Sequence, residues 1–515
     1  MRKILLILCF IGIGFTSSKA QKTKISWGQK AGLTISDAAP DFEILGSIDG
    51  YYYTLIKHYA NAASKKVNII TRITLLKFDA SHNQLFSKDI IPESGSGFLK
   101  AFTYSDHFQF FYQGLDEKKR TALYVQDIGL EGNELSVPQL IDSRSPQKAG
   151  FESYHIEQFD GDKFLVSYNY QFDVKSASYL LNSKSSIIVF SRLFQKVYEA
   201  ELGDITKDSK VIHSQLFGAD NGNLVLLNTA AGKAKAEYQH QLAEWNYETK
   251  EYRKIALGIK EKSVKFSENE NQFIAVALTA RANNEASVNL IFQSVDRESF
   301  KTDEAVEIDL NQNSVGEYIA INEEFESEKS KEIKPYKKFN FNKISLKKNG
   351  NFVLRIEESI DYGTKFISNS GNIILVSIDN WGKLKWAKMV QRANQVPESN
   401  PELAAALEFE IGDVSYFIYN DHAENTKADG FSAGFQAKPV NISKPQTAVV
   451  SWVGIDANGK FSKGLIEDIS NMERSLYFNP QISKMNRDGN GVIMLMGVDK
   501  TKLSYKLGTI KFSIQ

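Results

Sequence analysis

Two short clusters of ionisable side chains are the residues whose types and spacing best suit chemistry. The first, Asp421, His422 and Glu424, follows an apolar run that ends at Tyr419 and opens a long polar stretch. Carboxylates and an imidazole so close together suit a divalent cation such as calcium, or acid–base catalysis. Because neighbouring strand residues point in opposite directions, they fit one metal ion poorly, and a hydrogen-bonded turn is the structural alternative.

The second cluster is Glu357, Glu358 and Asp361, at the corresponding place after the preceding apolar run. Paired carboxylates of this kind can cleave glycosidic bonds or hold calcium, although carboxylates at strand ends are also ordinary solvated groups. The remaining histidines are scattered and show no His-x-x-x-His spacing, which argues against a zinc site. No cofactor is predicted from the sequence.

The elements that must position these side chains come from a repeat. A polar turn followed by an apolar strand occurs eight times, with the apolar run beginning at Tyr51, Phe108, Phe164, Leu224, Phe273, Phe352, Val414 and Val492. A candidate third strand follows each run, and one of them, Ile373 to Ile378, leads through the turn Asp379-Asn-Trp-Gly382 into an alternating strand. Four short antiparallel strands per unit at this period predict an all-β fold, the β-propeller.

Eight four-stranded blades fit the repeat best, and seven are the alternative. The last unit supplies only three strands before Gln515, so we expect Lys24 to Gln29 to add the missing one and close the ring. Residues 21–515 then form a single domain with a charged insertion at 311–339 and a long loop at 420–445. The connections between second and third strands are long in most units, at 58–71, 171–185, 229–240, 358–371 and 420–445. We expect function on the face that carries them.

The first twenty residues predict export. A basic head at Arg2 and Lys3 precedes an apolar stretch, and Ser18 and Ala20 suit a signal peptidase that cuts before Gln21. The only cysteine, Cys9, lies within this signal peptide, so the mature chain has no thiol chemistry. We expect a location in the periplasm, at the cell surface or outside the cell.

The charge balance limits the partners. The chain has 62 basic and 62 acidic residues, which argues against an electrostatic grip on nucleic acid. No second apolar stretch reaches membrane length, so no span is expected after signal cleavage. We expect a monomer whose partner is an envelope protein or glycan.

The hairpin Ile378-Asp-Asn-Trp-Gly-Lys-Leu-Lys-Trp386 resembles those of exported bacterial β-propeller repeat proteins. A similar turn recurs at Ile455 to Lys460, and a looser relative spans Phe78 to Asn83. Such families include binding scaffolds, lectins, lyases and hydrolases, so the resemblance implies the architecture and no catalytic residue.

Two functions follow as hypotheses. The first is a non-enzymatic, exported propeller that binds an envelope protein or glycan through its loop-rich face. The alternative is a hydrolase or lyase acting on polysaccharide on the same face, with Glu357, Glu358, Asp361, Asp421 or Glu424 as its carboxylates. The enzyme hypothesis predicts a central pocket with convergent carboxylates.

Overall fold

The computed structural model describes most of the chain, and all structural statements below concern the residues that it describes. They are residues 26–29, 31–32, 41–59, 70–92, 97–145, 153–159, 163–173, 178–206, 211–218, 223–231, 238–261, 264–282, 286–310, 336–361, 367–392, 394–397, 404–426, 440–441, 448–468, 477–478, 480, 484–485, 492–499 and 504–511. The expected signal peptide, and all of the charged insertion before Tyr336, lie outside this set.

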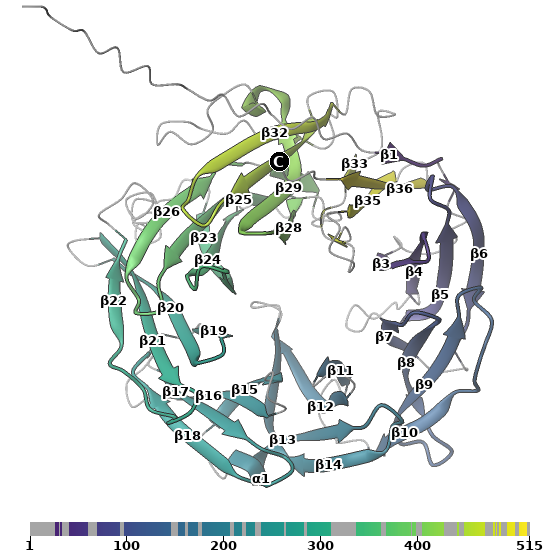
Figure 1. Cartoon of the computed structure of the whole chain (residues 1–515). Coiled ribbons are helices and arrows are strands. Elements are labelled where there is room, and N and C mark those ends of the chain that lie inside the picture. Colours follow the sequence, from purple (N-terminus) through teal and green to yellow (C-terminus); the bar gives the residue numbers. More distant parts are fainter. Residues whose placement is uncertain are drawn as a thin grey trace, which may run out of the picture.

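Eight antiparallel blades form a ring, as the repeat predicted (Figure 1). Blade 1 contains β3 (Asp41–Ile48), β4 (Tyr51–Tyr59), β5 (Ile70–Phe78) and β6 (Gln84–Ile90). Blade 2 contains β7 (Gly97–Thr103), β8 (His107–Leu115), β9 (Thr121–Gly129) and β10 (Gln139–Arg144). Blade 3 contains β11 (Tyr154–Phe159), β12 (Lys163–Asp173), β13 (Ser178–Phe190) and β14 (Lys196–Glu201), followed by the short helix α1 (Leu202–Thr206). Blade 4 contains β15 (Val211–Gly218), β16 (Leu224–Ala231), β17 (Tyr238–Trp245) and β18 (Tyr252–Leu257).

The second half repeats the plan. Blade 5 contains β19 (Val264–Glu268), β20 (Gln272–Ala282), β21 (Ala286–Asp296) and β22 (Val306–Asp309). Blade 6 contains β23 (Tyr336–Leu346), β24 (Phe352–Asp361), β25 (Ile367–Ile378) and β26 (Leu384–Val390), with β27 (Asn394–Pro397) paired to β25 and β30 (Val440–Asn441) paired to β27. Blade 7 contains β28 (Ala406–Ile411), β29 (Val414–His422), β31 (Ala448–Ile455) and β32 (Phe461–Asp468), and the 3₁₀ helix η3 (Ala423–Thr426) follows β29.

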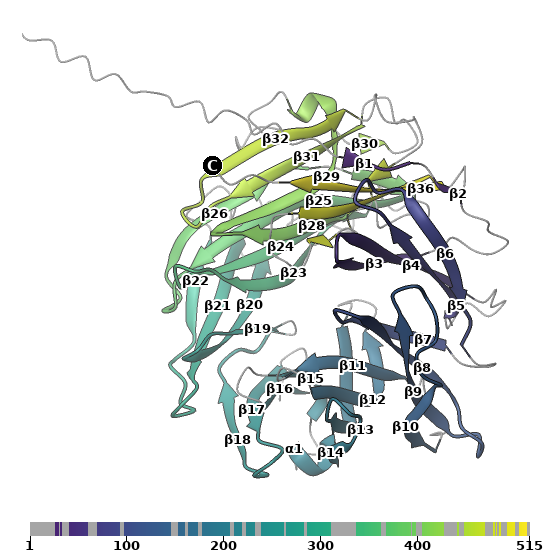
Figure 2. The ribbon, with the colours of Figure 1, turned by 45° about the vertical axis from the view of Figure 1, so that its right-hand side comes forward.

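The two ends of the chain meet in blade 8, as predicted. This blade contains β33 (Tyr477–Phe478), β34 (Lys484–Met485), β35 (Val492–Asp499) and β36 (Ser504–Lys511), and its outer strands are β1 (Ser26–Trp27) and β2 (Ala31–Gly32). Trp27 pairs with Gly508, and the Gly28 amide donates to the Leu507 carbonyl at 3.0 Å. Figure 2 shows β1 beside β36 from a second direction. The closure removes the open sheet edge that an unclosed last blade would leave.

The turn between the third and fourth strands explains why the repeat can be recognised in the sequence. In the two close matches, the Oδ1 atoms of Asp379 and Asp456 each accept hydrogen bonds from two backbone amides, at 2.8–3.0 Å. Gly382 and Gly459 then adopt positive φ values of 79° and 78°. In the looser relative, His82 occupies the same position with a φ of 64°. The aspartate therefore stabilises the turn by accepting these amide hydrogen bonds, and the residue three positions later must adopt a positive φ.

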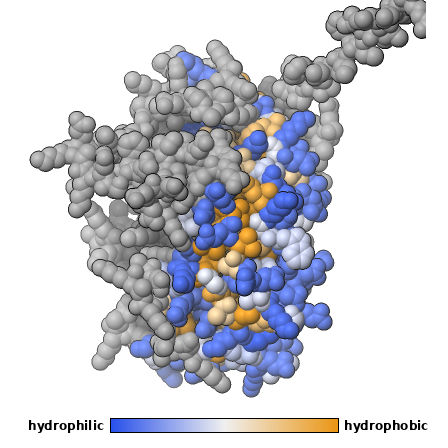
Figure 3. All heavy atoms as spheres, turned by 90° about the vertical axis from the view of Figure 1, so that its left-hand side faces the viewer, coloured by the Kyte–Doolittle hydropathy of each residue, from blue (hydrophilic) through white to orange (hydrophobic). Residues whose placement is uncertain are grey.

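Apolar side chains fill the spaces between neighbouring blades. In the space between blades 1 and 2, for example, Tyr53 and Phe108 pack edge to face, with ring centroids 5.1 Å apart. On the side of the ring that faces the viewer in Figure 3, hydrophobic residues gather along the middle of the coloured surface and hydrophilic residues flank them. Within the described part of the chain, no helix is long and apolar enough to cross a membrane.

Several connections predicted to be long loops are instead continued hairpins. Between Gln171 and Ser185, the ladder of β12 and β13 continues to the pair Asp173–Ser178. In blade 7, β29 runs on to His422, so the polar stretch predicted to begin at Asn420 starts as a strand. Polar residues pair as readily as apolar ones where a strand projects beyond the core, and the sequence pattern therefore does not mark the strand's end.

Candidate functional site

A polar pocket of about 460 Å³ lies against the innermost strands of blades 1, 2 and 3. These strands, β3, β7 and β11, are the ones nearest the axis of the ring (Figure 1). Eight residues line this inner-strand pocket: Glu43, Leu45, Lys100, Ala101, Phe102, Thr103, Glu157 and Gln158. The volume falls within the usual range of ligand pockets, about 300–1,000 Å³.

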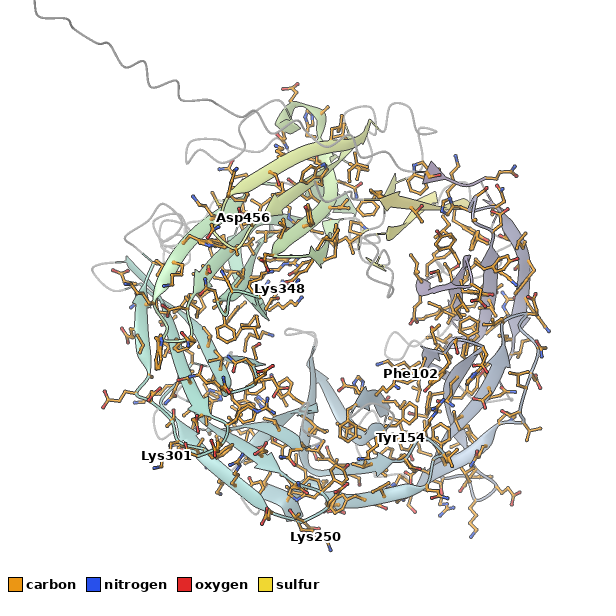
Figure 4. The ribbon with its side chains drawn as sticks, in the orientation of Figure 1. Phe102, Tyr154, Lys250, Lys301, Lys348 and Asp456 are labelled. Atoms are coloured by element: carbon orange, nitrogen blue, oxygen red, sulfur yellow. The ribbon has the colours of Figure 1, made fainter. Side chains whose placement is uncertain are left out.

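Three ionisable groups face the inner-strand pocket, and each has a partner. Glu43 Oε2 is 2.8 Å from Lys57 Nζ. Lys100 Nζ donates to the Ile156 carbonyl at 3.0 Å and lies 5.2 Å from the centre of the Phe102 ring. Figure 4 places Phe102 on the axis side of blade 2, whereas Lys250 and Lys301 lie on the outer rim.

Glu157 is the pocket carboxylate whose protonation is most clearly perturbed. His155 Nε2 donates to Glu157 Oε1 at 2.8 Å. This hydrogen bond holds the pKa of Glu157 below its usual value, against the opposing effect of burial. Glu157 is therefore an anion at neutral pH, and it can accept a proton or stabilise positive charge.

Bulges in two of the three strands help to aim these side chains. The pairing of β3 with β4 shifts between Ile44 and Gly46, and that of β7 with β8 shifts between Phe98 and Lys100. A bulge inserts one residue and turns the following side chain to the other face of the sheet. Glu43 and Lys100 lie at or next to these irregularities.

The predicted cluster of Glu357, Glu358 and Asp361 lies on β24, and its first member takes part in the contact between blades 6 and 7. Glu357 pairs with the guanidinium of Arg355, lies 3.7 Å from Arg392 Nη2, and accepts from Asn342 Nδ2 at 2.6 Å. Burial acts to raise the pKa of Glu357, but the two arginines outweigh it, so that this pKa lies below its usual value.

Glu358, the next residue of β24, points the other way and is only 2% exposed. Its carboxylate accepts from the Asn372 amide at 2.9 Å and fills the space beside Gly371. Asp361 ends the strand, and its side chain lies outside the described set. The structure therefore keeps Glu357 and Glu358 on opposite faces of one strand.

The predicted cluster on β29 is divided between a buried and an exposed part. Asp421 is 1% exposed, and its Oδ1 accepts from the His422 amide and from Asn425 Nδ2, both at 2.8 Å. Burial raises the pKa of Asp421 above its usual value. Glu424 is exposed in η3, and its amide donates to His422 Nδ1 at 3.2 Å. Among the described residues, no group of three His, Cys, Asp or Glu side chains could hold a metal ion.

Arg392 connects the two predicted clusters, and no motif or spacing around it predicted this role. Its side chain is 1% exposed and donates to the Ala404 carbonyl at 2.8 Å. It interacts electrostatically with Glu357, Glu358 and Tyr419, and Tyr419 in turn interacts with Asp421. Glu357, Glu358 and Asp421 thus belong to one buried polar seam between blades 6 and 7, and none of them lines the inner-strand pocket.

The strand topology and the ring closure define this chain as an eight-bladed β-propeller. No family model matches it, and no curated protein matches it in sequence. Among solved structures, the polysaccharide lyase Uly1 is 9% identical with a TM-score of 0.42, over 95% of this chain and 100% of that one.

Two other solved structures show likeness at the same low level. A prolyl endopeptidase structure is 12% identical with a TM-score of 0.38, over 93% of this chain and 55% of that one. A PL25 polysaccharide lyase, an ulvan lyase, is 11% identical with a TM-score of 0.35, over 79% of this chain and 90% of that one. Likeness this weak assigns no activity to this chain.

Proposed function

We propose that the protein acts on a polysaccharide, which it takes up in the inner-strand pocket. The observation that carries this proposal is the convergence of Glu43, Lys100 and Glu157, from three different blades, on one polar pocket of about 460 Å³. Sugars present hydroxyl groups that pair with carboxylates and ammonium groups, and apolar ring faces that pack on aromatic side chains. Phe102 also lines the pocket, but it is only 6% exposed and packs against Phe111 and Phe164, so the recognition rests on the polar groups.

Glu43 and Glu157 are the candidate carboxylates for the chemical step. Glycoside hydrolysis commonly uses two carboxyl groups that flank the scissile bond, one as acid and one as base or nucleophile. Glu157, held ionised by His155, suits the base or nucleophile. Glu43, whose Oε2 lies 2.8 Å from Lys57 Nζ, is the candidate for the second carboxyl role. For an acidic sugar, Lys100 would face the carboxylate of the substrate.

A non-enzymatic binding protein for an envelope protein or glycan is the second candidate. One observation favours it: both pocket carboxylates already have a cationic or hydrogen-bonding partner, Lys57 for Glu43 and His155 for Glu157. Groups neutralised in this way suit recognition as well as catalysis.

A depolymerisation assay separates the two candidates. The purified protein is incubated with neutral and acidic polysaccharides, and new reducing ends and the ultraviolet absorbance of unsaturated uronate are measured. We expect cleavage of at least one polymer, and a loss of about 100-fold or more in Glu43→Gln and Glu157→Gln. The control, Glu304→Gln on the exposed outer side of blade 5, should keep full activity.

Retention on a glycan column without any cleavage would support the binding candidate and refute the enzymatic one. Cleavage that survives both pocket substitutions would refute the assignment of the pocket. Export is a separate proposal, which depends on residues 1–20 alone. Sequencing the N-terminus of protein secreted by its native host should find Gln21, and a start at Met1 would refute it.

A further inference from the structure

A second, smaller pocket of about 120 Å³ lies between blades 1 and 2. Seven residues line this pocket, called here the blade 1–2 pocket: Ile91, Pro92, Tyr112, Tyr124, Gln126, Glu134 and Pro138. They come from the segment after β6, from the middle strands β8 and β9, and from the segment before β10. The blade 1–2 pocket shares no residue with the inner-strand pocket, so it is a separate site.

Tyr112 gives the blade 1–2 pocket an unused polar group. The side chain is 2% exposed, and within the described part of the chain its hydroxyl has no hydrogen-bond partner. A buried hydroxyl left without a hydrogen bond destabilises the folded protein. A ligand that supplies a hydrogen bond there offsets this destabilisation. Burial, together with the charge of Glu134, raises the pKa of the hydroxyl, so Tyr112 stays neutral and its oxygen can accept.

Glu134 gives the blade 1–2 pocket an unneutralised negative charge. Its carboxylate is exposed and, among the described residues, forms no ion pair. Lys77 of blade 1 pairs with Glu131 and not with Glu134. An anionic ligand would be repelled here, whereas a cation would be attracted.

The rim of the blade 1–2 pocket is apolar and exposed. Ile91 is 71% exposed, and Leu135 and Val137, which flank lining residues, are 56% and 79% exposed. Pro92 and Pro138 supply further apolar walls. Large apolar side chains gathered around a pocket are typical of a surface that another polypeptide covers.

We propose that the blade 1–2 pocket binds the side chain of a lysine presented by a partner protein. The ammonium group would contact the Glu134 carboxylate and the Tyr112 hydroxyl oxygen, beside the aromatic ring of Tyr124. The lysine methylenes would pack against Ile91, Pro92 and Pro138. A purely apolar side chain would leave the Tyr112 hydroxyl unpaired and would bury the charge of Glu134 without compensation.

The test uses the Ile91 side chain as a reporter. The full mature protein is labelled at isoleucine δ1 methyl groups, and the Ile91 signal is assigned with Ile91→Val. Nα-acetyl-lysine N-methylamide is titrated as the probe, with the norleucine analogue as a matched neutral control. We expect a saturable shift of the Ile91 methyl with the lysine probe only, and a Kd of roughly 1 mM.

Two conservative variants test the assigned contacts. Glu134→Gln should weaken binding about tenfold or more, and Tyr112→Phe severalfold, while Glu117→Gln in the exposed β8–β9 turn should bind as the native protein does. Tyr112→Phe keeps the packed ring, so it should fold and unfold at an equal or higher temperature. An equal response to both probes, no saturable response to lysine, or unchanged binding in Glu134→Gln would overturn the proposal.

Discussion

Replacing Arg355 by methionine should destabilise the ring through the seam between blades 6 and 7. The guanidinium of Arg355 bridges two carboxylates, reaching Glu408 Oε2 at 2.5 Å and Glu357 on the other side. The Arg355 side chain is 13% exposed, so its removal strands two largely buried negative charges. Breaking a buried pair in this way typically costs about 3–5 kcal/mol.

The remaining partners place the expected cost near the lower end of that range, at about 3 kcal/mol. Glu357 keeps Arg392 at 3.7 Å and Asn342 at 2.6 Å, and Glu408 keeps Lys343 at 3.6 Å. The double variant Arg355→Met/Glu408→Gln should recover part of the loss, because it removes one of the stranded charges. Arg72→Met breaks an exposed pair with Asp89 and should cost less than about 1 kcal/mol.

The pH dependence has a definite sign. The pKa of Glu357 lies below its usual value of 4.5 in the folded state, so its pairing stabilises the fold fully above that value. This contribution disappears as the pH falls through the lower, folded-state pKa. The difference between the native protein and Arg355→Met should therefore be constant near neutral pH and shrink below pH 4.5.

Urea unfolding, followed by tryptophan fluorescence, measures these differences in unfolding free energy. The comparison requires that the slope of the unfolding free energy against urea concentration is the same in each variant. Two results would refute the reasoning. One is a loss in Arg355→Met no larger than in Arg72→Met. The other is a difference that persists undiminished in acid.

Three further predictions concern other parts of the ring. Deleting residues 21–32 removes β1 and β2, so unfolding should begin at a lower temperature and light scattering should show association through the opened edge; an unchanged monomer would contradict the closure. Gly459→Ala should lower the free energy of unfolding by about 2–3 kcal/mol, because a Cβ there would lie 2.8 Å from the Trp386 ring. The control Gly412→Ala has open space around the new Cβ, so it should lower the free energy of unfolding by only about 1 kcal/mol, from backbone strain. Asp421→Asn should stabilise the protein at neutral pH, because burial raises the pKa of Asp421 and the charged carboxylate carries a penalty that grows as the pH rises from the ordinary value of 3.8 to the raised pKa; a marked loss of stability at pH 7 would contradict this.

The fold was predictable because each blade repeats a local rule. The Asp-x-x-Gly turn needs an aspartate that accepts backbone amides and a residue that tolerates positive φ, and both leave a mark in the sequence. Even in the turn where His82 replaces the glycine, the aspartate and the residue with positive φ keep the same separation along the sequence. The ends of projecting strands, as in β12 and β13, left no such mark, because polar residues there pair without a core.

The inner-strand pocket was not predictable in the same way, since three separate blades build it. Glu43 and Lys100 are single charged residues between apolar neighbours, and Glu157 lies between Ile156 and Gln158. This is also the pattern of an ordinary strand with one solvated face. One signal was available. Glu43 and Lys100 each precede the first apolar residue of the following strand, Tyr51 and Phe108, by eight residues. Equivalent positions in successive blades point to the same place near the axis.

The carboxylates at 357, 358 and 421 drew attention because they are close together in the sequence. The structure shows that adjacency along a strand separates side chains: Glu357 and Glu358 lie on opposite faces, and Asp421 is buried beneath its own turn. Arg392 interacts with Glu357 and Glu358, and with Asp421 only through Tyr419; it lies just after β26, where no pattern marks it. Charge clusters on one strand therefore predict packing between blades better than they predict a site.

The most direct test is a crystal structure of the protein bound to an oligosaccharide. The oligosaccharide is one released from the polymer that the protein retains or cleaves. We predict a sugar ring in the inner-strand pocket, within hydrogen-bond distance of Glu43 and Glu157. An oligosaccharide bound only on the outer rim or on the second–third strand hairpins, with the inner-strand pocket holding solvent, would contradict it.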